Sequence, residues 1–160
     1  MEPNPGLFSL FTKARKEDVN INVGIATTSG YGTYYCLDAQ TLNTFSEEDA
    51  ANSIREGHVL KEKKNLKLIT PQEVSEEYFG GKWPDFMTLD VEGLDLDILE
   101  KFSFEGETMK VVCVETISYS TTGHGVKDEE TIRFMKEKGY LLHADTYINS
   151  IFVKKKYWYK

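Results

Sequence analysis

The fold is indicated most clearly by residues 85–93, which read Asp-Phe-Met-Thr-Leu-Asp-Val-Glu-Gly. An apolar run that stops at a carboxylate predicts a short strand, and the glycine predicts a turn out of it. Apolar residues then recur at helical spacing, at Leu94, Ile98, Leu99 and Phe102. A strand that turns directly into a helix is typical of layered α/β folds.

Strand and helix patterns alternate on both sides of this stretch. Downstream, residues 110–116 predict a strand buried on both faces, followed by a helix ending at Gly139 and strands at 140–144 and 151–153. Upstream, helices are expected at 4–14, 46–57 and 70–80, and strands at 19–25, 34–37 and 66–69. The alternation predicts one α/β domain over residues 1–160, with a mostly parallel sheet and an antiparallel C-terminal hairpin.

Composition excludes several classes of protein. The 160 residues carry a net charge of −7, which argues against a nucleic-acid binder. Two cysteines, Cys36 and Cys113, are too few for a disulfide scaffold or the common zinc patterns. No apolar run approaches the ~20 residues of a membrane span, and residues 1–5 do not resemble a signal peptide. We therefore expect a cytoplasmic protein that binds neither nucleic acid nor membrane.

Ligands of open α/β sheets bind beyond the carboxyl ends of the strands, so acidic residues at those ends are candidates. Asp90 and Glu92 close a predicted strand just before a helix. One of them could hydrogen-bond a ligand or act as a general base. The competing interpretation is a helix cap, a role that acidic residues often fill for stability alone.

Other candidates carry weaker signals. Glu115 ends the apolar run 111–114, where a carboxylate is costly unless it is paired, so a structural ion pair is an equal alternative. Glu2 alone indicates a surface residue at a chain end. His124 offers an imidazole in a glycine-rich loop, although a solvated loop histidine is the simpler interpretation, and no metal-ligand spacing surrounds it. Cys113 is expected to be a small core residue.

Several motifs, taken in order, resemble those of the FkbM family of S-adenosylmethionine-dependent methyltransferases. They are Glu-Pro-Asn-Pro at 2–5, Asn-Ile-Asn-Val-Gly-Ile at 20–25, the stretch 85–93, Val-Cys-Val-Glu at 112–115, and the closing segments 139–140 and 149–153. The resemblance covers essentially the whole chain. It implies a Rossmann-like methyltransferase fold, a three-layer sandwich whose sheet lies between helices and ends in an antiparallel strand.

The resemblance also implies roles for individual residues on the cofactor side. Glu2 would hold the ribose hydroxyls of S-adenosylmethionine, since a carboxylate accepts from two vicinal hydroxyls, with Asn4 beside it in the same motif. Gly24 and Ile25 would line the adenine side. Asp90 would lie near the methionine end of the cofactor.

On the acceptor side, Asp90 and Glu92 would act as catalytic residues, with a carboxylate or His124 taking the proton of the acceptor hydroxyl. Glu115 would face the substrate. The implied reaction is methyl transfer to a hydroxyl of a saccharide or another small metabolite, with no metal involved.

Relative to the family pattern, the chain lacks the first strand, its glycine loop and the first helix, because Met1 directly precedes Glu2. We expect such an N-terminally incomplete fold to bind cofactor weakly and to expose a sheet edge that invites a homodimer. The rival hypothesis is an inactive remnant that serves as an interaction module. A metal-dependent hydrolase using Asp90 and Glu92 is the least favoured class, since no histidine partner lies nearby in sequence.

Overall fold

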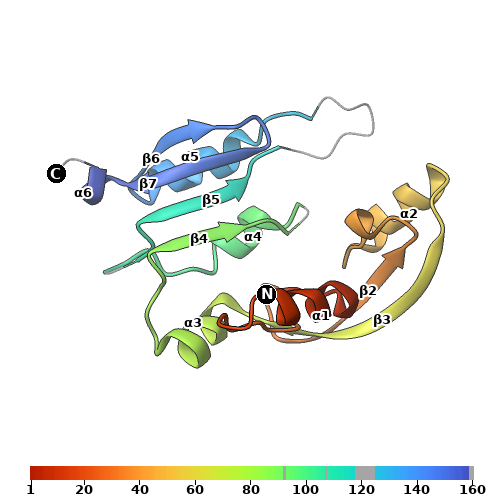
Figure 1. Cartoon of the computed structure of the whole chain (residues 1–160). Coiled ribbons are helices and arrows are strands. Elements are labelled where there is room, and N and C mark those ends of the chain that lie inside the picture. The colour runs from red at the N-terminus through yellow and green to blue at the C-terminus, as the bar shows by residue number, and fades with distance from the viewer. Residues whose placement is uncertain (92, 107, 118–124, 159–160) are drawn as a thin grey trace. The chain divides into compact units, whose positions relative to one another are not determined.

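The computed structural model describes residues 1–91, 93–106, 108–117 and 125–158, which form two compact units. The first unit is Met1–Thr70 and the second is Pro71–Lys160. Figure 1 shows the elements in chain order. Each unit has its own sheet, and the two are described separately below.

The first unit holds a three-stranded sheet in the order β1-β3-β2. Its elements are α1 (Pro5–Ala14), β1 (Gly24–Ile25), β2 (Gly30–Leu37), a 3-10 helix η1 (Gln40–Leu42), α2 (Glu47–Arg55) and β3 (Leu60–Ile69). β1 pairs with β3 in parallel, whereas β2 and β3 run antiparallel along most of their length. The core side chains of this unit are Val23, Tyr34, Tyr35, Cys36, Leu37, Ala50 and Ile69.

The strand expected at 19–25 is much shorter in the structure, where only Gly24 and Ile25 pair with β3. Val19 is 75% exposed, so the alternating pattern that starts there does not mark a buried face. The chain before β1 is held instead by the N-terminal segment, because the amide of Glu2 donates to the carbonyl of Ile21 at 3.0 Å. That contact is non-local and could not be read from the pattern.

The second unit holds a four-stranded sheet in the order β4-β5-β7-β6. Its elements are α3 (Pro71–Phe79), β4 (Phe86–Leu89), α4 (Asp95–Leu99), β5 (Val111–Glu115), α5 (Glu129–Glu137), β6 (Tyr140–Asp145), β7 (Asn149–Lys154) and α6 (Lys155–Trp158). β4 and β5 are parallel, β7 is antiparallel to β5, and β6 and β7 form the antiparallel hairpin predicted from the sequence. Helices α4 and α5 contact each other on one side of this sheet (Figure 1).

The mostly parallel sheet expected from the sequence is not what the described strands form. Two strand pairs are parallel and three are antiparallel, in two mixed sheets. The reason lies in chain order: β7 returns between β5 and β6, and β2 runs against the long strand β3. The α/β class is confirmed, and the description that fits is two small mixed sheets with helices.

β5 supplies the centre of the core of the second unit. Val112 and Val114 are fully buried, while Val111, Cys113 and Glu115 on the other face are half-buried, so the strand expected to be buried on both faces is buried on one. Around it lie Ile98, Leu99, Met109, Met135, Tyr140 and Phe152, all without exposed surface. The hydroxyl of Tyr140 donates to the carbonyl of Met109 at 2.6 Å, which satisfies its one polar atom in the core.

Candidate functional site

The N-terminal acidic motif is tied down by its own neighbours. Glu2 is half-buried, and its Oε1 accepts from the backbone amide of Asn4 at 2.7 Å. The side-chain amide of Asn22 donates to the carbonyls of Glu2 and Pro3 at 2.7 and 3.0 Å. These hydrogen bonds fix the backbone of Glu2 and give its carboxylate a defined position.

Asn4 has a structural role that the sequence also predicted. Its Oδ1 accepts from the amide of Gly6 at 3.0 Å, so it caps α1, and Pro5 occupies the first helical position. The side chain of Asn4 is only 6% exposed. A capping role therefore accounts for this residue type at this place.

Gly24 and Ile25, expected on the adenine side, form β1. A Cβ added to Gly24 would lie 2.7 Å from Cδ2 of Leu68 and 2.8 Å from the ring of Phe45. A larger residue here would therefore have to displace the side chains of Leu68 and Phe45. Ile25 is half-buried and pairs with Ile69.

The turn after β4 follows the prediction. Asp90 directly follows Leu89, the last residue of β4, and is exposed. Gly93 has φ of 87°, a conformation that L side chains rarely adopt, so a glycine is needed for the turn into α4. The N-cap of α4 is Leu94, which has no capping side chain, so Asp90 does not serve as the N-cap. Glu92 lies outside the described residues.

Asp95 is the residue of this turn that sequence reasoning missed. It begins α4, is 6% exposed, and its Oδ1 has no hydrogen-bond partner among the described residues. Burial, and then the charge of Asp90, raise the pKa of Asp95 to about 6, although backbone amides of Val91, Gly93 and Asp95 itself favour its ionised form. The signal available in the sequence was a third acidic residue, after Asp90 and Glu92, placed between Leu94 and Leu96 inside an apolar helical pattern.

Glu115 ends β5 and pairs in register with Asn149 of β7; its side chain is half-buried. In the neighbouring pair, Leu89 of β4 lies opposite Val114, so Asp90 and Glu115 come at the same level of adjacent strands. The structure therefore brings Asp90 and Glu115 to one edge of the second sheet. His124 lies outside the described residues.

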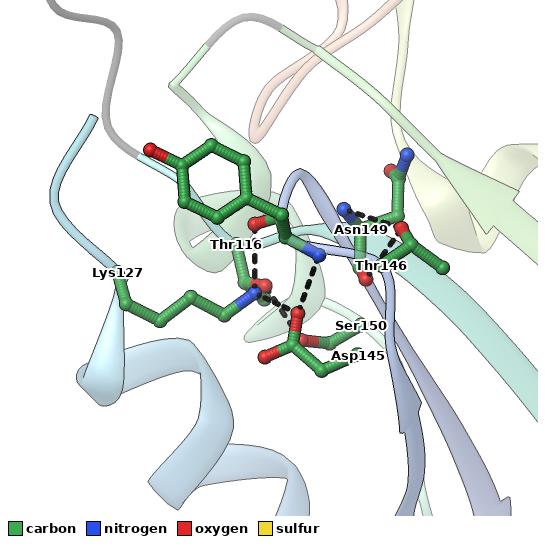
Figure 2. A network of polar contacts seen from close by, with 7 residues as sticks. Thr116, Lys127, Asp145, Thr146, Asn149 and Ser150 are labelled. Carbon is green, nitrogen blue, oxygen red and sulfur yellow. Dashed lines mark hydrogen bonds and ion pairs between the residues drawn. The ribbon is translucent and has the colours of Figure 1, made fainter. Parts of the chain in front are cut away.

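The same edge carries a polar network around the β6–β7 turn (Figure 2). Lys127 Nζ donates to Asp145 Oδ1 at 2.8 Å and to the carbonyl of Tyr147 at 3.1 Å. The same Oδ1 accepts from the amide of Tyr147 at 2.8 Å. These two donors, Lys127 first, hold the pKa of Asp145 below its usual range. No pattern in the sequence pointed to this network, because Lys127 is 18 and 20 residues away from Asp145 and Tyr147.

Next to the network lies a fully buried hydroxyl pair. Thr116 and Ser150 have no exposed surface, and their Oγ1 and Oγ atoms are 2.6 Å apart. The amide of Thr116 also donates to the carbonyl of Ile148 at 2.9 Å, and Figure 2 shows both residues beside the turn. The end of β5 is thereby joined to the β6–β7 hairpin.

Two further features concern residues 1–91, 93–106, 108–117 and 125–158. No cluster of three or more histidine, cysteine or acidic side chains could hold a metal ion there. No helix in the same ranges is long and apolar enough to cross a membrane.

Comparison with known proteins gives one match. The model of the methyltransferase FkbM domain matches residues 1–142. No curated protein and no solved structure compared with the chain matches it significantly. The matched residues include the N-terminal motif and the acidic ends of β4 and β5, the places where the residues themselves directed attention. The chain therefore belongs to the FkbM methyltransferase family.

Proposed function

We propose that this protein transfers a methyl group from S-adenosylmethionine to a hydroxyl oxygen of a saccharide or another small metabolite. The observation that carries the proposal is the family match over residues 1–142. It is supported by the placement of Asp90 and Glu115 at one edge of the sheet in the second unit, the edge where ligands of α/β proteins bind.

The residues of the first unit suit the ribose end of the cofactor. Glu2 uses Oε1 for the amide of Asn4, and a carboxylate has further acceptor capacity on both oxygens. The carboxylate of Glu2 can therefore accept hydrogen bonds from two vicinal hydroxyls, and the backbone that carries it is already fixed. Asn4 contributes by holding this geometry, and Gly24 and Ile25 are proposed to line the adenine side.

The second unit offers chemistry suited to a positively charged methyl donor. When bound, S-adenosylmethionine supplies an electrophilic methyl group on a cationic sulfur. Asp90 is exposed at the carboxyl end of β4 with the buried carboxyl of Asp95 close enough to feel its charge. Negative charge here favours a cationic group, and none of the salt bridges between described residues involves either carboxylate.

In the proposed reaction this chain's residues would hold the acceptor so that one of its hydroxyls faces the methyl group that the cofactor would supply. Asp90 would accept the proton of that hydroxyl as the methyl group is transferred to its oxygen. Glu92 and His124 are the other proposed proton acceptors, and Glu115 is proposed to orient the acceptor. Most of the rate enhancement would come from positioning the two reactants.

The test is calorimetry with S-adenosylhomocysteine, the demethylated product, on the wild-type chain and on Glu2→Ala. Loss of a charged hydrogen-bond acceptor should weaken binding by about 1–3 kcal/mol. Glu17→Ala is the matched control, since Glu17 is exposed in the same unit and should have no effect. Equal affinity of Glu2→Ala and wild type would remove Glu2 from the site. No binding by the wild type would favour the interaction-module hypothesis.

A further inference from the structure

The turn between β6 and β7 contains an unusual backbone conformation. Tyr147 has φ of 77°, and among the described non-glycine residues it is alone in having a positive φ. Bulky residues are rarely found there, because the conformation crowds Cβ against the backbone. Such strain persists only where the surroundings enforce it, and it is concentrated at functional positions.

Three polar contacts enforce the conformation of Tyr147. Asp145 accepts from its amide at 2.8 Å, and Lys127 donates to its carbonyl at 3.1 Å while pairing with Asp145 at 2.8 Å. The turn is closed next to it, because the amide of Thr146 donates to the carbonyl of Asn149 at 2.8 Å (Figure 2). The backbone on both sides of Tyr147 is thus held, yet its side chain remains 59% exposed.

The turn lies at the same edge of the second sheet as the candidate acidic residues Asp90 and Glu115. Asn149 is opposite Glu115 in the register of β5 and β7, and Leu89, one residue before Asp90, is opposite Val114. Ile148 and Val126, which flank the network, are 51% and 72% exposed. An exposed aromatic residue with exposed apolar neighbours therefore lies at the same end of the second sheet as Asp90 and Glu115.

We propose that Tyr147 binds the methyl acceptor by stacking its ring on the apolar face of a neutral pyranose sugar, with Lys127 and Asp145 as positioning residues. This inference rests on the proposed function and names the acceptor class. A sugar ring has C–H faces that an exposed aromatic ring can cover. It also has hydroxyls that can donate hydrogen bonds to the carboxylates of Asp90 and Glu115. Lys127 is paired with Asp145, and Asp90 adds an exposed carboxylate at this end of the sheet, so a neutral acceptor is favoured over an anionic one.

The experiment uses saturation-transfer NMR titrations of the full chain with methyl β-D-glucopyranoside as the probe. Wild type should bind, Tyr147→Phe should keep the affinity within twofold, and Tyr147→Ala should lose at least fivefold. Tyr31→Ala is the matched control, because Tyr31 is 72% exposed but lies on β2 in the other unit, and it should bind like wild type. Methyl β-D-glucuronide should bind at least fivefold more weakly than the neutral glycoside.

Two further variants separate a binding role from a folding role. Tyr147→Gly removes both the ring and the strain, so it should unfold at a temperature no lower than wild type and still lose glycoside binding. Lys127→Met should weaken glycoside binding by releasing the turn, with the ring unchanged. Unchanged binding by Tyr147→Ala, or equal binding of the glucuronide, would overturn the proposal.

Calorimetry with S-adenosylhomocysteine on the same variants keeps this inference distinct from the proposed function. Tyr147→Ala should bind that product as wild type does. If the product binds but the glycoside does not, the methyltransferase assignment stands and the role of Tyr147 falls. If the glycoside binds through Tyr147 but the product does not bind, the sugar site stands and the methyltransferase assignment falls.

Discussion

A buried carboxyl such as Asp95 is unusual because ionisation in a poorly solvated place is costly. The side chain is 6% exposed, faces backbone amides of its own turn, and lies near the negative charge of Asp90. The amides help to hold the turn that carries Asp90, while burial and Asp90 oppose the ionised form. The hydrogen bonds that Asp95 makes to this turn therefore depend on pH, because they favour its ionised form.

The pH dependence of stability follows from the raised pKa of Asp95. The folded state holds the proton up to about pH 6, whereas the unfolded chain releases it near 3.8, so stability falls as pH rises through this window. The full effect is about 3 kcal/mol at most. Asparagine cannot titrate, so the free energy of unfolding of Asp95→Asn, compared with that of wild type, should be higher at pH 7 than at pH 4. Urea unfolding at both values measures this, and Asp97→Asn, exposed on the same helix, is the control. A constant difference between Asp95→Asn and wild type would contradict the assignment.

The strain at Tyr147 also makes a stability prediction. Glycine adopts a positive φ without steric cost, so Tyr147→Gly should raise the free energy of unfolding by up to about 1 kcal/mol. The same substitution at Tyr31, in the extended strand β2, should lower it by about 1 kcal/mol, because glycine weakens strands. Chemical denaturation of both variants gives the comparison. A loss of stability in both would mean that the contacts of the Tyr147 ring outweigh its backbone strain.

At the scale of elements, β5 and β7 are joined by both backbone pairing and a buried side-chain contact. Val112 and Val114 fill the core face, and the hydroxyls of Thr116 and Ser150 meet where β5 ends. Since neither hydroxyl reaches water, each depends on the other as a partner. This dependence holds the β6–β7 hairpin, and Tyr147 with it, against the end of β5.

A double-mutant cycle tests that connection. Ser150→Ala leaves the Thr116 hydroxyl buried without this partner, and Thr116→Val does the converse, so each should cost about 1–3 kcal/mol. The double variant should cost clearly less than the sum, because no unpaired hydroxyl remains. Unfolding free energies of the four proteins give the coupling. Strict additivity would show that the two hydroxyls do not depend on each other.

At the scale of the whole molecule, open strand edges decide whether a second chain can pair with this one. β2 lies at an edge of the first sheet, and its outer side is partly covered, because Tyr35 and Thr44 exchange backbone hydrogen bonds of 2.8 and 3.2 Å. Residues 30–33 of β2 lack such cover among the strands described. This short stretch is one open edge at which a second chain could pair, and β1, β4 and β6 are the other outermost strands among those described.

We expect light scattering coupled to size-exclusion chromatography to detect a dimer whose population rises with protein concentration. Charged side chains blunt strand edges, so the double variant Tyr31→Lys/Thr33→Lys should shift the population to the monomer. Both residues are exposed, which should leave the fold intact. Lys13→Glu, on the exposed face of α1, serves as a charge-change control. A wild-type protein that stays monomeric at high concentration would refute the expectation.

The sequence alone determined the features that depend on local chemistry. Asn4 and Pro5 start α1, Gly93 marks the turn after β4, and the position of Asp90 follows from the end of an apolar run. Each of these signals comes from a few adjacent residues whose backbone preferences are strong. The family could be identified for the same reason, because its motifs are short and occur in order.

Only the tertiary structure decided the features that join distant segments. The mixed strand order, the short strand β1 and the braced turn of Tyr147 depend on partners such as β3 and Lys127, which the local pattern does not specify. The burial of Asp95 also depends on tertiary structure, because it results from the packing of α4 on the core. Strand pairing and burial depend on contacts between residues that are far apart in the sequence. The alternating pattern therefore predicted where strands form but not which strands lie next to each other.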